Sequence, residues 1–287
     1  MLILRPGVAV RSSALFFQSL PAVAAAQGLE GAVVACSNTP YLCKLLTQPL
    51  SPHEADAVQS LIDFREWAVV GPDREILRTF FSWPLHRVID DASGLTVGVL
   101  IPRAEHRFYY AHGGSYHLRE GQHLPRPESA AGYFSLRERL GVLRDLARAM
   151  DVLARHNYVY GDINSRNLAF SPDGVPAVFL LDCDGIRREG DLTLKPRHQQ
   201  RWSDPHNPGV NSLATDQYLL ALWILRVLTS SMAQPPVGAC VDWGQTSIPL
   251  ATHTELQRLL TAGLGPSFGR PSPADFLPIL TALHRVA

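Results

Sequence analysis

The sequence has few cysteines, and their spacing excludes the two kinds of site that cysteines most often indicate. The four cysteines lie far apart, and no two of them form a Cys-x-x-Cys pair. Neither a zinc site nor a disulfide framework is therefore predicted, and we expect a reduced, cytoplasmic protein. The four are Cys36, Cys43, Cys183 and Cys240.

Charge imbalance and long apolar runs are also absent. The chain carries 26 basic and 26 acidic residues, and 46% of its residues are hydrophobic. This balance favours a folded protein with a large core and argues against a nucleic-acid partner. No stretch reaches the roughly 20 unbroken apolar residues of a membrane span. Pro6, Arg11 and Pro21 interrupt the apolar N-terminal segment, so we expect neither a membrane partner nor a secretory signal.

Lysine is nearly missing from the chain. Only Lys44 and Lys195 are lysines among the 26 basic residues, a ratio that codon bias toward arginine explains. Lys44 nevertheless stands inside the apolar run "YLCKLL". A compact ammonium and a planar guanidinium are not interchangeable where a charge must reach one point. A lone lysine in a strand is more often an edge residue, so Lys44 becomes a candidate only together with other motifs.

The first third of the chain is predicted to be rich in β-structure. Residues 31–37 and 41–46 read as two strands, and residues 82–90 and 95–104 as a hairpin turned at "DASG". Between these pairs, residues 51–69 read as a helix. Its N-terminal sequence "SPHE" offers a serine N-cap, a proline at the first position and a capping-box glutamate.

The remainder of the chain is predicted to be helical. Residues 135–156 carry apolar side chains at helical spacing, and residues 212–232 are apolar on most sides, as a buried helix would be. Two further helices are expected over residues 252–264 and 272–286. This pattern predicts an α+β protein with two lobes, residues 1–102 and 103–287, that together form one domain.

The stretch "YVYGDINSRNLAF" packs polar residues between apolar ones, and it carries a resemblance. Asp162, Asn167 five residues later, and Asp182 in "LLDCDG" follow the long helix in the order found in the eukaryotic-like protein kinase superfamily. The whole chain from 26 to 283 resembles this family, and most of all a divergent bacterial branch. Further matches in the first part of the chain are Gly28, Gly31 and Val33 of the glycine-rich loop, with Ala26 where the first glycine would stand, and Lys44 at the position of the third-strand lysine. Later matches are "RWSDP" at the end of the activation segment, Asp216 at the start of the central buried helix, and Arg270 at the family's structural arginine near the end of the domain.

The resemblance implies a bilobal fold with ATP and Mg²⁺ held in a cleft between the lobes. Lys44 and the glycine-rich loop would hold the phosphates, Asn167 and Asp182 the metal, and Asp162 would act as the base on the attacking hydroxyl. The lysine's glutamate partner stays open between Glu54 and Glu66. The resemblance places nucleotide-binding positions at Ile101, Pro102, Arg103 and Ala104, and structural roles at Asp216 and Arg270.

Three further positions depart from the family pattern. Gly161 stands where an arginine usually precedes the base, which predicts activity without a phosphorylation switch. Asn164 replaces the lysine of Ser/Thr kinases, and Arg166 is expected to take its place in catalysis. Asp184 replaces a glycine; it is expected to touch the metal or to pair with a nearby arginine, and to be dispensable, whereas Asp182 is not.

The prediction is an active Ser/Thr protein kinase that transfers phosphate from ATP to a protein substrate, itself included. Thr193 and Ser203, in the polar segment after Asp182, are the expected sites of autophosphorylation. Two alternatives remain. "YGD" also resembles the His-Gly-Asp of small-molecule kinases acting on aminoglycosides or choline, and a pseudokinase scaffold would bind nucleotide without turnover.

Overall fold

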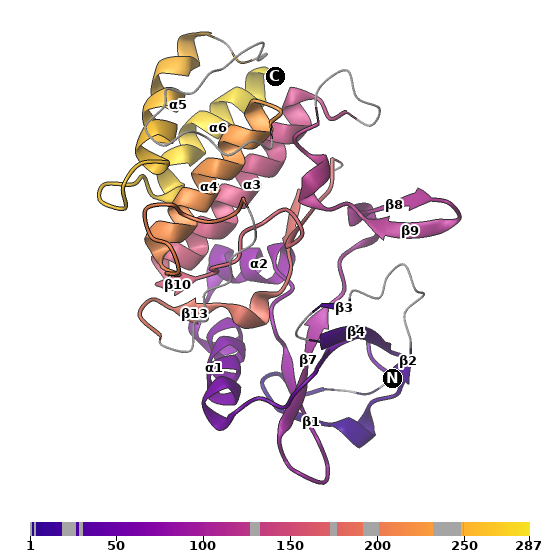
Figure 1. The fold of residues 1–287 in the computed structure, drawn as a ribbon. Helices are drawn as coiled ribbons and strands as arrows, with labels where there is room; N and C mark the ends of the chain where they lie inside the picture. Colours follow the sequence, from indigo (N-terminus) through magenta and orange to yellow (C-terminus); the bar gives the residue numbers. More distant parts are fainter. Residues whose placement is uncertain are drawn as a thin grey trace. The chain divides into compact units, whose positions relative to one another are not determined.

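The computed structural model describes residues 2, 4–18, 27–28, 31–126, 133–172, 177–191, 201–231, 248 and 250–287. These residues form a mixed α+β structure, as predicted (Figure 1). The chain divides into two compact units. The first consists of Met1–Leu118 and Leu180–Arg187, and the second of Arg119–Phe179 and Arg188–Ala287.

A seven-stranded sheet forms the centre of the first unit. Its order is β1-β6-β7-β5-β4-β2, with β3 paired to β4. Only β1 and β6 run in parallel among these pairs. The strands are β1 (Val10–Arg11), β2 (Phe17–Gln18), β3 (Gln27–Gly28), β4 (Gly31–Cys36), β5 (Tyr41–Leu46), β6 (His86–Ile89) and β7 (Thr96–Pro102). The predicted strands β4 to β7 are confirmed, whereas β1 and β2 are too short to show a periodic pattern.

Helix α1 (Pro52–Asp63) covers the face of the sheet on which Lys44 lies. Val58 and Ile62 of α1 pack against Val99 of β7. Lys44 stands directly opposite Val99 in the antiparallel pairing of β5 with β7. Because opposite residues of such a pair project to the same face, the Lys44 side chain points to the α1 side.

The predicted helix over residues 51–69 divides into two elements, an α-helix and a π-helical turn. Its capping box is confirmed, since the Glu54 N–H donates to Ser51 Oγ and the Ser51 N–H donates to the Glu54 carboxylate. The α-helix ends at Asp63, and a π-helical turn follows over Phe64–Ala68. A further helix, α2 (Gly71–Phe80), was not predicted.

A second unpredicted element closes the first unit. Strands β8 (Tyr109–His112) and β9 (Ser115–Leu118) pair antiparallel around Gly113 and Gly114, which have φ of 56° and 78°. Glycine suits such a turn because it adopts positive φ without steric cost. The first unit therefore extends to Leu118 and not to residue 102, and it also takes up Leu180–Arg187 from later in the chain.

Four helices form most of the second unit, and all four were predicted. They are α3 (Leu136–Arg155), α4 (Leu213–Leu228), α5 (Leu250–Gly263) and α6 (Pro273–Val286). Helix α3 packs against α4 and α6, and α5 packs against the same two helices (Figure 1). Leu219 to Ile224 of α4 are all buried, which agrees with its apolar sequence on nearly every side.

Short elements connect the helices. They are the strands β10 (Tyr158–Val159), β11 (Leu168–Phe170), β12 (Val178–Leu180) and β13 (Arg187–Arg188), with 3₁₀ turns at Ser12–Ala14, His106–Phe108, Gly121–His123 and Cys183–Gly185. Strand β11 pairs with β12. None of the helices in the described part of the chain is long and apolar enough to cross a membrane.

Candidate functional site

The two units carry different parts of the predicted site. In the first unit lie Gly28, Gly31, Val33, Lys44, Glu54, Glu66, Ile101, Pro102, Arg103, Ala104 and Asp182. In the second lie Asp162, Arg166, Asn167, Asp216 and Arg270.

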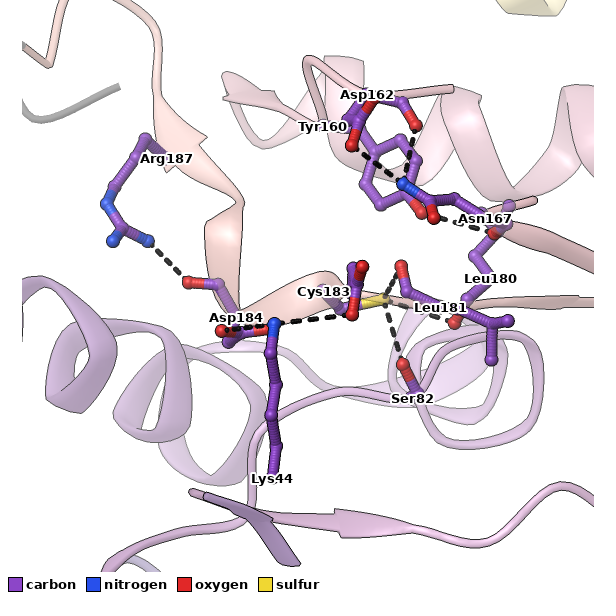
Figure 2. A network of polar contacts seen from close by, with 11 residues as sticks. Lys44, Ser82, Tyr160, Asp162, Asn167, Leu180, Leu181, Cys183, Asp184 and Arg187 are labelled. Atoms are coloured by element: carbon purple, nitrogen blue, oxygen red, sulfur yellow. Dashed lines mark hydrogen bonds and ion pairs between the residues drawn. The ribbon is translucent and has the colours of Figure 1, made fainter. Parts of the chain in front are cut away.

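Lys44 is the centre of an acidic cluster in the first unit (Figure 2). Its ammonium donates to Asp182 Oδ1 at 3.2 Å, and to Asp184 Oδ1 and Oδ2 at 2.9 and 3.0 Å. The side chains of Lys44 and Asp184 are 7% and 12% exposed, whereas that of Asp182 is 45% exposed. The structure thus brings Lys44 to Asp182, and it gives Lys44 a closer and more buried partner in Asp184.

The segment carrying both aspartates is attached to the first unit by its backbone and by a buried thiol. The Ser82 N–H donates to the Leu180 carbonyl at 2.7 Å, and Ser82 Oγ donates to Cys183 Sγ at 3.6 Å. The Cys183 thiol in turn donates to the Leu180 carbonyl at 3.2 Å (Figure 2). Complete burial raises the pKa of Cys183, so the thiol stays protonated and serves as a donor rather than as a nucleophile.

Asp182 has an unusual backbone conformation. Its φ of 49° and ψ of 38° lie in the left-handed region, which aspartate tolerates better than most residues but which still costs free energy. Residues held in such conformations concentrate at functional sites. The following turn is fixed by Arg187, whose Nη1 donates to the Asp184 carbonyl at 2.7 Å.

The two predicted loop glycines face each other across a strand pair. Gly28 of β3 stands opposite Gly31 of β4, while Ala26 lies outside the described residues. A Cβ built on Gly31 would lie 2.0 Å from the Leu45 carbonyl oxygen. The close approach of β4 to β5 therefore requires glycine at position 31, whatever the loop binds. Val33 stands opposite Lys44 in the same pairing.

The predicted nucleotide-binding stretch begins at the end of β7. Ile101 and Pro102 pair with Leu42 and Tyr41 of β5. Arg103 is exposed and Ala104 is buried. The backbone of this stretch leaves the sheet after Pro102, where it no longer forms a strand.

The two glutamates considered as partners of Lys44 have other contacts in the structure. The Glu54 carboxylate accepts from Ser51 in the capping box. Glu66 is buried and forms ion pairs with Arg65 and Arg74. The choice between them stays a prediction, and the lysine itself forms an ion pair with Asp184.

In the second unit, Asn164 organises the loop that carries Asp162. Its Nδ2 donates to Asp162 Oδ1 at 2.7 Å, and its Oδ1 accepts from the backbone N–H groups of Arg166 and Asn167 at 2.8 and 3.1 Å. Asn164 is 1% exposed. The sequence indicated only a replaced lysine at this position, although asparagine is common in turns because its side chain accepts from the backbone two residues further on, as it does here from Arg166.

Asn167 fixes the other carboxylate oxygen of Asp162. Its Nδ2 donates to Asp162 Oδ2 at 2.7 Å (Figure 2). With the amide nitrogen used in this way, the amide oxygen of Asn167 takes part in no hydrogen bond among the described residues. That oxygen is a hard donor of the kind that Mg²⁺ prefers. No group of three or more His, Cys, Asp or Glu residues in the described ranges could hold a metal ion.

Asp216, at the start of α4, holds the backbone just before Asp162. It accepts hydrogen bonds from the N–H groups of Tyr160 at 2.7 Å and Gly161 at 2.9 Å. Complete burial raises the pKa of Asp216 to about 7, although the two hydrogen bonds favour the charged form. Gly161 has a φ of 72°, and a Cβ there would lie 2.9 Å from Asn211 Nδ2. Both facts explain why glycine stands at position 161.

Arg270 forms a buried ion pair with Asp204 of "RWSDP". Its Nη1 and Nη2 donate to Asp204 Oδ2 and Oδ1 at 2.5 and 2.9 Å, and both side chains are 0% exposed. Burial favours protonation of Asp204, but the hydrogen bonds from Arg270, Asn207 and the His206 N–H, together with the charge of Arg270, outweigh it and lower the pKa of Asp204. Nearby, Trp202 packs on Trp223 with ring centroids 4.7 Å apart. These contacts anchor the segment that the resemblance identifies as the end of the activation segment.

The remaining predicted residues divide between described and undescribed parts. Arg166 is exposed, and it opposes the rise that burial causes in the pKa of Glu120. Ser203 is half-buried, whereas Thr193 and Cys240 lie outside the described residues.

The chain was compared with models of protein families and with curated proteins. Neither comparison gives a match.

Proposed function

We propose that the chain is an ATP- and Mg²⁺-dependent phosphotransferase with a bilobal kinase-like fold, and that it acts as a Ser/Thr protein kinase. The observation that carries the proposal is the ion pair between Lys44 and Asp182, which stand 138 positions apart in the sequence. Sequence motifs singled out both residues independently. Their contact is what a site for a metal-bound triphosphate requires, because a cation for the phosphates then lies beside a carboxylate for the metal.

Two contacts in the second unit support the proposal. Asp216 holds the backbone before Asp162, and Arg270 pairs with Asp204. Each contact joins residues that the resemblance singled out and that lie 55 or more positions apart. Chance matches to short motifs would not be expected to meet in this way.

The residues have separate tasks in the proposed reaction. Lys44 would neutralise charge on the phosphates, and the bound Mg²⁺ would supply further neutralisation through Asn167 and Asp182. Asp162, held by two amide groups, would orient the acceptor hydroxyl and take its proton. Arg166 is exposed and would contribute the positive charge that Asn164 lacks.

Incubation of the purified protein with labelled ATP and Mg²⁺, alone and with a generic protein acceptor, tests the proposal. We expect label on protein, lost by about 10²-fold or more in Lys44→Arg and in Asp162→Asn. Lys195→Arg is the matched control, since it makes the same exchange at the only other lysine. Equal labelling by the two lysine variants would contradict the role of Lys44.

A small-molecule kinase is the second candidate, and Gly161 is the observation that favours it. The positive φ of Gly161 and the close approach of Asn211 to its α-carbon favour glycine before the base, as in the His-Gly-Asp kinases. Label on a small alcohol or aminoglycoside, with none on protein, would establish this alternative. Nucleotide binding without transfer to any acceptor would indicate a pseudokinase.

Phosphopeptide mapping after self-incubation examines the acceptor more closely. We expect label between residues 191 and 203, at Thr193 or Ser203, without any requirement of this label for activity. Label only outside this segment would contradict the expected site.

A further inference from the structure

Asp184 lies closer to Lys44 than Asp182 does, and the proposed reaction gives Asp184 no role. Its two oxygens lie 2.9 and 3.0 Å from the ammonium, whereas Asp182 offers one oxygen at 3.2 Å. We propose that Asp184 is the positioning residue of Lys44: it holds the ammonium in place for the phosphates, the task that the resemblance assigned to a helix glutamate. This inference rests on the proposed function.

The burial of the two aspartates separates their roles. The side chain of Asp184 is 12% exposed and that of Asp182 is 45% exposed. A carboxylate that stays beside a cation throughout the reaction is expected to be enclosed, and one that must reach a metal ion is expected to be accessible. Asp184 fits the first description and Asp182 the second.

The hydrogen-bond donors of the Lys44 ammonium allow Asp182 and Asp184 to have these separate roles. A lysine ammonium has three N–H groups and no fixed plane. If Asp182 holds a metal ion, its contact with Lys44 is the longer one to give up, and a phosphate oxygen would take its place. Asp184 keeps its two contacts, so the ammonium does not leave its position.

The backbone around Asp184 is fixed independently of its side chain. Arg187 Nη1 donates to the Asp184 carbonyl at 2.7 Å, and the neighbouring Cys183 is fully buried and bonded to Ser82. The carboxylate is therefore presented to Lys44 by a rigid turn, which is what a positioning residue needs.

The usual candidate for this task has other partners. Glu66 is paired with Arg65 and with Arg74, and it lies in the π-helical turn after α1. Two arginines beside one carboxylate satisfy it electrostatically. Asp184, not Glu66, is then the acid that Lys44 depends on.

The reactivity of Lys44 can be measured separately from that of other lysines, because the chain has only two. In a Lys195→Arg background, Lys44 carries the only lysine amine, and its rate of acetylation by an N-hydroxysuccinimide ester can be followed by peptide mass spectrometry. The amine can be acetylated only when it leaves its buried contacts with the carboxylates. We expect Asp184→Asn, which removes the closer charged contact, to raise the rate at pH 7 about tenfold, Asp184→Glu to restore most of the protection, and Asp56→Asn, an exposed position on α1, to change nothing.

Turnover is measured on the same variants. The contact with Lys44 replaces the expectation from sequence that Asp184 is dispensable: Asp184→Asn is expected to lower kcat about 10²-fold, with partial rescue by Asp184→Glu and full activity in Asp56→Asn. An acetylation rate for Asp184→Asn equal to that of the parent protein overturns the inference. Turnover that rises in Asp184→Asn also overturns it, since Asp184 would then compete with the phosphates for Lys44.

The two proposals fail in different ways. If ATP gives no protection of Lys44 against acetylation and no label is transferred, the proposed function fails, while the effect of Asp184→Asn on the acetylation rate still stands. Should Asp184→Asn fail to fold, Asp184→Ser decides in its place: an acetylation rate above that of the parent supports the inference, and an unchanged rate contradicts it.

Discussion

The buried carboxylate of Asp216 makes the stability of the protein depend on pH in a direction that can be worked out. Burial raises the pKa of Asp216 from 3.8 to about 7, against the opposing effect of the N–H groups of Tyr160 and Gly161. Because the folded-state value is the higher one, the contribution of this group is fully present below pH 4. It is lost as the pH rises toward and through 7.

The magnitude follows from the two pKa values. Each unit corresponds to about 1.4 kcal/mol, so the contribution of this group to the free energy of unfolding falls by about 2.5 kcal/mol between pH 5 and pH 8. Asp216→Asn cannot titrate, and it loses one of the two N–H acceptors at a cost of about 1–3 kcal/mol. The gap in stability between the parent protein and this variant should therefore narrow by about 2.5 kcal/mol over that range.

Urea unfolding followed by tryptophan fluorescence, at several pH values from 5 to 8, gives this gap directly. Circular dichroism of Asp216→Asn shows whether its fold is retained. A stability difference that stays constant with pH would mean that the effects of burial and of hydrogen bonding on the pKa of Asp216 cancel. A gap that widens with pH would mean that the hydrogen bonds outweigh burial, and the reasoning would be refuted.

Three further changes have defined outcomes. Arg270→Met leaves Asp204 buried without its ion-pair partner and should lower the free energy of unfolding by about 3–5 kcal/mol; a loss below 1 kcal/mol in a urea titration would contradict the burial of the pair. Gly31→Ala forces a Cβ into a backbone carbonyl and should cost about 1–3 kcal/mol or more, whereas an unchanged urea midpoint would show that β4 and β5 can separate. Asn164→Ala removes one of the groups that hold Asp162 and should lower kcat about 10²-fold with little change in the ATP dissociation constant; steady-state kinetics with isothermal titration calorimetry separate the two quantities.

Long periodic segments were predictable from the sequence, and short elements were not. Helix α1 started where its capping box indicated, because the serine, proline and glutamate at its N-terminus act locally. A π-helical turn continues α1 to Ala68, so the sequence reads as one helix up to that point. Helix α2 begins shortly afterwards, at Gly71, and its residues were not recognised as helical. The hairpin of β8 and β9 carries a clear Gly-Gly turn, yet the residues of β8 do not alternate between apolar and polar, and those of β9 do so over only four positions.

The candidate site was predictable in its members but not in its contacts. Spacing along the chain singled out Lys44 and Asp182, and the structure joins them. Spacing could not show that Asp184 lies closer to the lysine, because the positive φ of Asp182 turns the chain in a way that sequence does not reveal. The role of Asn164 was missed for a similar reason, since it acts through four hydrogen bonds within its own loop.

The central claim is that the chain transfers the γ-phosphate of ATP with a metal ion bound through Asp182. Labelled-phosphate transfer across a Mg²⁺ titration, for the parent protein, Asp182→Asn and the control Asp56→Asn, tests it most directly. We expect transfer that rises with Mg²⁺ in the parent and in Asp56→Asn, and none at any Mg²⁺ concentration in folded Asp182→Asn. Mg²⁺-dependent transfer by Asp182→Asn at the level of the parent would contradict the claim.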